Sequence, residues 1–159
     1  MKGKIILVVF LVFAVICIGF CLLFIIKSLK KVEIKDINHF SFGYSVGNYM
    51  DANVSYTLDC ADVCVATVKK EGVKEEDASK IEVKSDFVKG LEDILKKYDV
   101  ASWDGFSKSD KRVLDGYSFS LYTKMSNGDS ISARGYMKWP KNYKEVRTDL
   151  NKYFEELIK

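Results

Sequence analysis

Residues 117–137 read YSFSLYTKMSNGDSISARGYM, and this stretch indicates what kind of fold to expect. Apolar and polar side chains alternate on both sides of Asn127-Gly128, which is the pattern of strands with one buried face. Asn-Gly accepts the positive φ angles of a type I′ turn, which joins two antiparallel strands. We therefore predict a β-hairpin here. The side chains on its inward face are Tyr117, Phe119, Leu121, Thr123 and Met125 before the turn, and Ile131, Ala133, Gly135 and Met137 after it.

Two segments, one on each side of this hairpin, have the spacing of amphipathic helices. The first begins near Ser85, a favourable N-cap, and carries charged residues such as Glu92 away from its apolar face. The second begins near Tyr143, after Pro140 has ended the last strand. We expect both helices to pack on a sheet. Their apolar residues are Phe87, Leu91, Ile94, Leu95 and Tyr98 in the first, and Val146, Leu150, Phe154 and Leu157 in the second.

Shorter β-prone runs precede the first helix. They lie at 40–46, 54–58 and 65–68, with a strand fragment at 81–83. Turn-forming residues separate the first run from the second, and a loop with two cysteines separates the second from the third. These runs predict three antiparallel strands before the helix.

Cys60 and Cys64 bound the loop between two of these strands. A three-residue hairpin loop places them across from each other, at a separation that a disulfide can bridge. Two reduced thiols are the alternative. A zinc site would need further ligands, and the only histidine is His39, which lies beside the start of the first strand. The spacing also differs from the C-x-x-C of thioredoxin-like redox proteins.

Residues 5–26 are all apolar, Ala, Gly or Cys. At a rise of about 1.5 Å per residue this run is long enough to cross the hydrocarbon core, so we predict a transmembrane helix. A cleaved signal peptide is the main alternative, but the run exceeds a usual h-region and no A-x-A-like site follows it. Lipidation at Cys17 or Cys21 is disfavoured because large residues precede both cysteines.

The charges beside this segment do not decide its orientation. Lys2 and Lys4 precede it, and Lys27, Lys30 and Lys31 follow it, so the positive-inside rule finds similar flanks. A very short N-terminal tail is typical of an uncleaved signal-anchor, and a cysteine pair suits an oxidising compartment. We therefore expect the C-terminal domain to lie outside the cytoplasm.

The net positive charge belongs to the N-terminal segment. The chain has 25 Lys and Arg against 22 Asp and Glu, and five of the basic residues flank the apolar run. The rest of the chain therefore holds 20 basic against 22 acidic residues. A nucleic-acid-binding domain would need a basic face of its own, so we expect no nucleic-acid partner.

The sequence also contains no glycine-rich phosphate loop, and it indicates no cofactor.

These patterns predict three parts: an N-terminal transmembrane anchor with basic flanks at 1–31, a juxtamembrane connector at 32–38, and an extracytoplasmic domain at 39–159. The domain is expected to have an α+β fold. We predict an antiparallel sheet of about five strands with two amphipathic helices on one face, preceded by one transmembrane helix.

Residues 103–116, WDGFSKSDKRVLDG, contain most of the candidates for a binding surface. Three aspartates on one loop could hold calcium or act on a polar substrate, although the spacing fits no EF-hand and Asp-Gly is common in turns. Aromatic side chains beside turns either fill the core or bind glycans or proteins. We assign no catalytic, metal or cofactor residue. The candidate ligand or partner surface is Trp103, Asp104, Asp110, Asp115 and Trp139.

Residues 103–143 also contain the motifs WDGFSKSD, VLDGYSFSL, NGDSISARGY and WPKNY. This pattern resembles one found in an uncharacterised family of bacterial membrane-anchored or lipoprotein-like envelope domains. The resemblance covers about a quarter of the chain. It implies a location in the bacterial cell envelope, and it implies no catalytic residue because no activity is known for that family.

We therefore expect a non-enzymatic binding or structural module. Its expected partners are the lipid bilayer and an envelope protein or glycan. One alternative is a small envelope hydrolase that uses the loop aspartates. Another is an inhibitor or immunity-type protein that neutralises an envelope enzyme or toxin.

Overall fold

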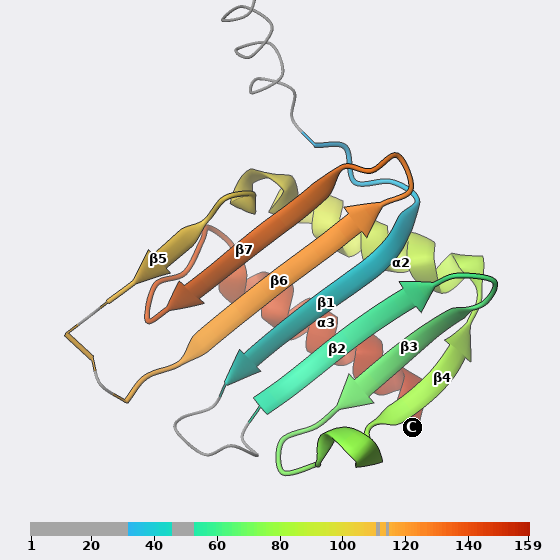
Figure 1. Cartoon of the computed structure of the whole chain (residues 1–159), viewed down its shortest axis with the longest axis horizontal. Coiled ribbons are helices and arrows are strands. Elements are labelled where there is room, and N and C mark those ends of the chain that lie inside the picture. The colour runs from blue at the N-terminus through green and yellow to red at the C-terminus, as the bar shows by residue number, and fades with distance from the viewer. Residues whose placement is uncertain (1–31, 46–52, 111, 114) are drawn as a thin grey trace, which may run out of the picture. The chain divides into compact units, whose positions relative to one another are not determined.

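A sheet covered on one face by two helices is the main feature of the described part of the chain (Figure 1). The computed structural model describes residues 32–45, 53–110, 112–113 and 115–159. The strands are β1 (Ile37–Ser45), β2 (Asn53–Cys60), β3 (Cys64–Lys69), β4 (Ser79–Val83), β5 (Ser107–Ser109), β6 (Ser118–Met125) and β7 (Ser130–Tyr136). The helices are α2 (Ser85–Lys97) and α3 (Tyr143–Glu155), with 3-10 turns η1 (Glu75–Asp77), η2 (Val100–Trp103) and η3 (Glu156–Ile158).

The strand order is β4-β3-β2-β1-β6-β7-β5. The first strand, β1, lies in the middle and pairs antiparallel with β2 on one side and β6 on the other. The predicted hairpin is present as β6 and β7, with Thr123 opposite Ile131. Tyr117 and Met137 lie just outside β6 and β7, and Tyr117 is exposed rather than inward-facing.

The prediction of an antiparallel sheet with about five strands is wrong. In the described residues the sheet has seven strands, and β5 runs parallel to β7. The fragment predicted at 81–83 is part of β4, which pairs with β3. The sequence of β5 is Ser-Lys-Ser and has no apolar alternation, so only its hydrogen bonds to β7 define it as a strand. Just before β5, the Phe106 carbonyl accepts a hydrogen bond from the Arg134 amide of β7 at 2.8 Å.

The predicted transmembrane helix at 5–26 lies outside the described residues. Within the part of the chain that the structure describes, no helix is long and apolar enough to cross a membrane. The described unit runs from Val32 to Lys159. Two residues of the segment predicted as a connector, Ile34 and Ile37, are buried in its core, and β1 already begins at Ile37.

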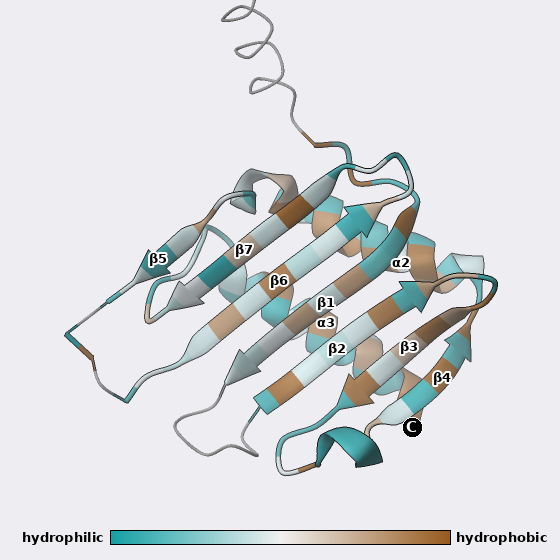
Figure 2. Cartoon of the chain, in the orientation of Figure 1, coloured by the Kyte–Doolittle hydropathy of each residue, from teal (hydrophilic) through white to brown (hydrophobic). Residues whose placement is uncertain are grey.

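The core lies between the inner face of the sheet and the two helices. Hydropathy alternates along the central strands, as the two-residue period of a sheet with one buried face requires (Figure 2). Phe154 of α3 stacks on Tyr56 of β2, with ring centroids 4.9 Å apart, and on Phe40 of β1 at 5.9 Å. These contacts place α3 across the middle strands.

Glu92 is a buried exception to the helix pattern. Its side chain belongs to α2 but lies against the start of β1, where its Oε1 accepts a hydrogen bond from the Ile37 amide at 3.3 Å. Its Oε2 lies 3.2 Å from Lys96 Nζ. The carboxylate thus accepts a hydrogen bond from a backbone N–H group at the edge of the core. Helical spacing alone does not predict that this side chain is buried.

Candidate functional site

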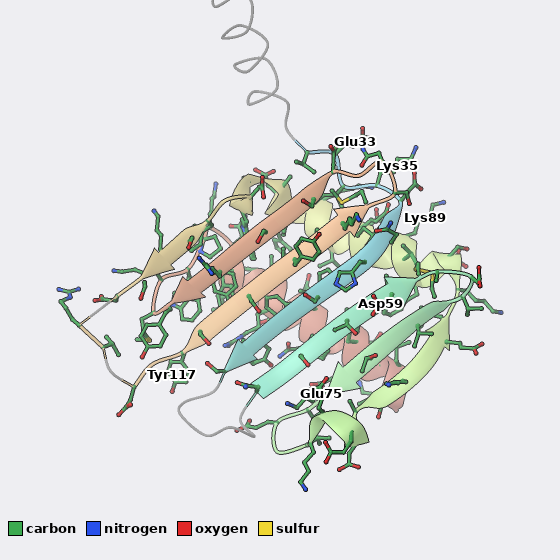
Figure 3. All side chains as sticks on the ribbon, in the orientation of Figure 1. Glu33, Lys35, Asp59, Glu75, Lys89 and Tyr117 are labelled. Atoms are coloured by element: carbon green, nitrogen blue, oxygen red, sulfur yellow. A yellow bond between two sulfur atoms is a disulfide. The ribbon has the colours of Figure 1, made fainter. Side chains whose placement is uncertain are left out.

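A cavity of about 310 Å³ lies where the ends of β1 and β7 approach the start of α3. We call it the Trp139 cavity, and its lining residues are Ser45, Tyr117, Trp139, Tyr143, Lys144 and Arg147. Figure 3 shows Tyr117 at the opposite end of the sheet from Glu33 and Lys35. The cavity therefore lies far from Glu33 and Lys35 within the described domain.

An aromatic stack forms one wall of the Trp139 cavity. The Trp139 and Tyr143 rings are nearly parallel, with centroids 4.5 Å apart, and Phe119 of β6 supports both from beneath at 5.7 and 4.7 Å. The backbone turns sharply on each side of Trp139, with a positive φ at Met137 and at Asn142. Because the stack holds it, Trp139 keeps a fixed position although 39% of its surface is exposed.

Two basic side chains of α3 line the same cavity. The Arg147 guanidinium lies over the Tyr44 ring, 5.3 Å from its centroid. Burial raises the pKa of Tyr143 to about 12, although the nearby Arg147 guanidinium opposes part of this rise. The Tyr143 hydroxyl therefore keeps its proton at neutral pH and can either donate or accept a hydrogen bond.

The Trp139 cavity has a positive local charge on a domain that is slightly acidic. No acidic side chain is among its described lining residues. The surrounding segment 138–147 holds four basic residues and one acidic residue, whereas residues 32–159 hold 20 basic against 22 acidic residues. This contrast favours an anionic ligand or partner.

A second hollow, of about 350 Å³, adjoins the Trp139 cavity at Ser45. It lies on the face of the sheet that the helices do not cover, over Gly43 of β1. Ser55 and Ser120 lie directly opposite Gly43 on the two neighbouring strands, and the Lys69–Glu75 ion pair also lines the hollow. The Ser45 and Ser118 hydroxyl oxygens are 2.7 Å apart and separate it from the Trp139 cavity.

The two tryptophans of the predicted surface have different environments. Trp103 is only 1% exposed, and its indole N–H donates a hydrogen bond to the Lys141 carbonyl at 3.0 Å. It belongs to the core, and its assignment to a ligand surface is corrected by this burial. Trp139 is exposed and lines the Trp139 cavity.

The predicted loop aspartates do not converge on one point. Asp104 accepts a hydrogen bond from the Ser132 amide at 3.0 Å, whereas Asp110 follows β5 and its amide bonds the Tyr136 carbonyl. Four residue steps along β7 separate these two partners, a distance of about 13 Å. Asp115 is exposed in the loop before β6.

The Asp110 carboxylate is surrounded by basic side chains. Arg112 donates two side-chain hydrogen bonds to its carboxylate, at 2.9 and 2.8 Å, and Lys138 Nζ lies 3.5 Å away. These bonds hold the pKa of Asp110 well below its usual range. Among the described residues, no group of three or more His, Cys, Asp or Glu side chains is placed to hold a metal ion.

His39 and Asp59 form a polar pair that the sequence analysis did not identify. They are opposite each other on β1 and β2, with His39 Nδ1 2.5 Å from Asp59 Oδ1, on the uncovered face of the sheet (Figure 3). The Tyr122 ring lies 5.6 Å from the imidazole. Only the cross-strand register reveals this pair, because the two residues are 20 positions apart in the sequence.

Cys60 and Cys64 are opposite each other at the turn between β2 and β3. Their Cα atoms are 4.0 Å apart and their sulfurs are joined at 2.04 Å. The bridge closes a loop of only a few residues, so its effect on stability is confined to this turn.

No protein-family model matches the sequence, and no curated protein matches it significantly. The resemblance of residues 103–143 to bacterial envelope domains therefore stays a prediction that depends on the four motifs alone.

Proposed function

We propose that this protein is a non-enzymatic binding module of the bacterial envelope, held at a membrane by its apolar N-terminal segment, with the Trp139 cavity as its ligand site. One observation carries this proposal: two of the four large apolar side chains exposed in the described residues, Tyr117 and Trp139, line the same cavity. Clustered exposed aromatic side chains beside basic groups are typical of binding sites.

The positions of the aspartates favour binding over hydrolysis. A pair of carboxylates that hydrolyses a glycoside lies about 5–10 Å apart, across the scissile bond. The Asp104 carboxylate instead accepts a hydrogen bond from the Ser132 amide of β7, and the Asp110 carboxylate forms an ion pair with Arg112. The hydrolase alternative therefore has no support from this pair.

Cysteine labelling tests the extracytoplasmic location. A membrane-impermeant maleimide is added to intact cells that express the full chain, with and without an impermeant reductant. We expect labelling of Cys60 and Cys64 only after reduction, because an oxidising compartment keeps them joined. A Cys60→Ser/Cys64→Ser variant is the control, because any maleimide label that it takes up must be on Cys17 or Cys21. Labelling that requires lysis but no reductant would place the domain in the cytoplasm.

Photocrosslinking in intact cells tests the Trp139 cavity itself. A photoreactive amino acid replaces Lys144 at the cavity, or Lys89 of α2, which does not line it. We expect a defined adduct from position 144 and none from position 89. Adding Trp139→Ala should reduce the adduct from position 144 at least about fivefold. Equal adducts from both positions, or an adduct insensitive to Trp139→Ala, would contradict the proposed site.

A further inference from the structure

We infer that the ligand of the Trp139 cavity is an anionic saccharide, an inference that rests on the proposed function and adds the chemical class of the ligand. Three properties of the cavity lead to this class: partly exposed aromatic side chains, basic groups that form no salt bridge with a described residue, and a neighbouring hollow lined in part by serine hydroxyls. Each of them matches a different part of such a sugar.

The exposed rings match the apolar face of a sugar. Tyr117 is 50% exposed and Trp139 is 39% exposed, while the stack on Tyr143 keeps the indole in place. A pyranose presents C–H groups on its ring face and hydroxyls at its edge, so it can cover an aromatic ring and still use polar groups around it. The cavity volume of about 310 Å³ is at the lower end of the range for small-ligand pockets, which suits one or two sugar rings.

The basic side chains match an acidic substituent on that sugar. Neither Lys144 nor Arg147 forms a salt bridge with another described residue, and the described partners of Arg147 are the tyrosine side chains Tyr44 and Tyr143. The Tyr44 ring holds the Arg147 guanidinium in place before any ligand binds. A preorganised guanidinium can form two parallel hydrogen bonds with a carboxylate or phosphate group.

The hollow over Gly43 distinguishes a saccharide from an acidic peptide. It adjoins the Trp139 cavity at Ser45, and its lining includes Ser55, Ser118 and Ser120 as well as the Lys69–Glu75 ion pair. A sugar chain that leaves the cavity along the sheet would find hydrogen-bonding partners for its hydroxyls there. An acidic peptide could bind Arg147 equally well, but its backbone would find no free strand edge on this face, because β1 is paired on both sides.

Binding measurements on the full-length protein in detergent micelles test this inference. The probes are galacturonic acid oligomers of three to six units and the same oligomers with each carboxyl group reduced to an alcohol. Hexaglutamate and inorganic phosphate serve as the peptide and free-anion probes. Trp139 supplies the signal, because its indole fluorescence should change on binding while that of the buried Trp103 should not.

We expect the acidic oligomers to bind at least about tenfold more tightly than the reduced ones, and more tightly than hexaglutamate or phosphate. Arg147→Gln should abolish the preference for the acidic oligomers, because it removes the guanidinium that pairs with their carboxylates. Lys152→Gln, which removes a charge elsewhere on α3, should preserve the preference.

Equal binding of charged and reduced oligomers would overturn the inference, and so would equal or tighter binding of hexaglutamate or phosphate. If no oligomer binds while the photocrosslink from position 144 still depends on Trp139, the saccharide is wrong and the site stands. If that photocrosslink is also absent, the proposed function itself fails.

Discussion

Replacing Trp103 with alanine should lower the free energy of unfolding by about 3–5 kcal/mol. The side chain is buried, and its ring lies 6.0 Å from Phe119 and 6.2 Å from Tyr143 between centroids. Alanine would leave a large cavity there and would also remove the hydrogen-bond donor of the Lys141 carbonyl. Urea unfolding followed by circular dichroism measures the loss.

Trp139→Ala is the matched control for this prediction. Its indole is 39% exposed and forms no hydrogen bond with a described residue, so its removal should cost about 1–2 kcal/mol. The two variants should therefore differ: Trp103→Ala should lose much more stability, whereas Trp139→Ala should weaken the photocrosslink from position 144. Similar stability losses in both would show that Trp139 is a core residue and not part of a ligand site.

Gly135→Ala should also destabilise the protein strongly, by about 2–3 kcal/mol. A Cβ atom at Gly135 would lie 2.1 Å from the Lys138 carbonyl oxygen and 2.5 Å from a Phe119 ring carbon. The carbonyl belongs to the backbone and cannot rotate away, so β7 or the turn that carries Trp139 would have to move. The midpoint of thermal unfolding measures this effect.

Gly43→Ala provides the comparison within the same sheet. A Cβ atom at Gly43 would make only ordinary contacts, the nearest at 3.6 Å, and its φ is not positive. Alanine there should leave stability unchanged or raise it by up to about 1 kcal/mol, because glycine loses more backbone entropy on folding. A loss of stability at Gly43 as large as at Gly135 would contradict the packing described for these two strands.

The candidate site was only partly predictable from the sequence. Trp139 was identified because it is aromatic and lies beside a turn, but the same reasoning included Trp103, which is buried. The two residues have similar local sequences, since each is followed by turn-forming residues. Arg147 lies outside the apolar repeat of the second helix, and nothing in the helical pattern distinguishes it from other basic residues of α3. Its contact with the Tyr44 ring, about 100 residues earlier in the chain, depends on the tertiary structure.

The sequence by itself determined the local elements: the hairpin at Asn127-Gly128, the two amphipathic helices, and which side chains of β6 and β7 point inward. It could do so because alternation and helical spacing are set by neighbouring residues. Only the tertiary structure decided that Ser-Lys-Ser is a parallel edge strand, that Glu92 is buried, and that Ser45, Tyr117 and Trp139 surround one cavity. Those outcomes depend on which distant segments pack together. Many weak contacts decide that packing, and they leave no periodic pattern in the sequence of any one segment.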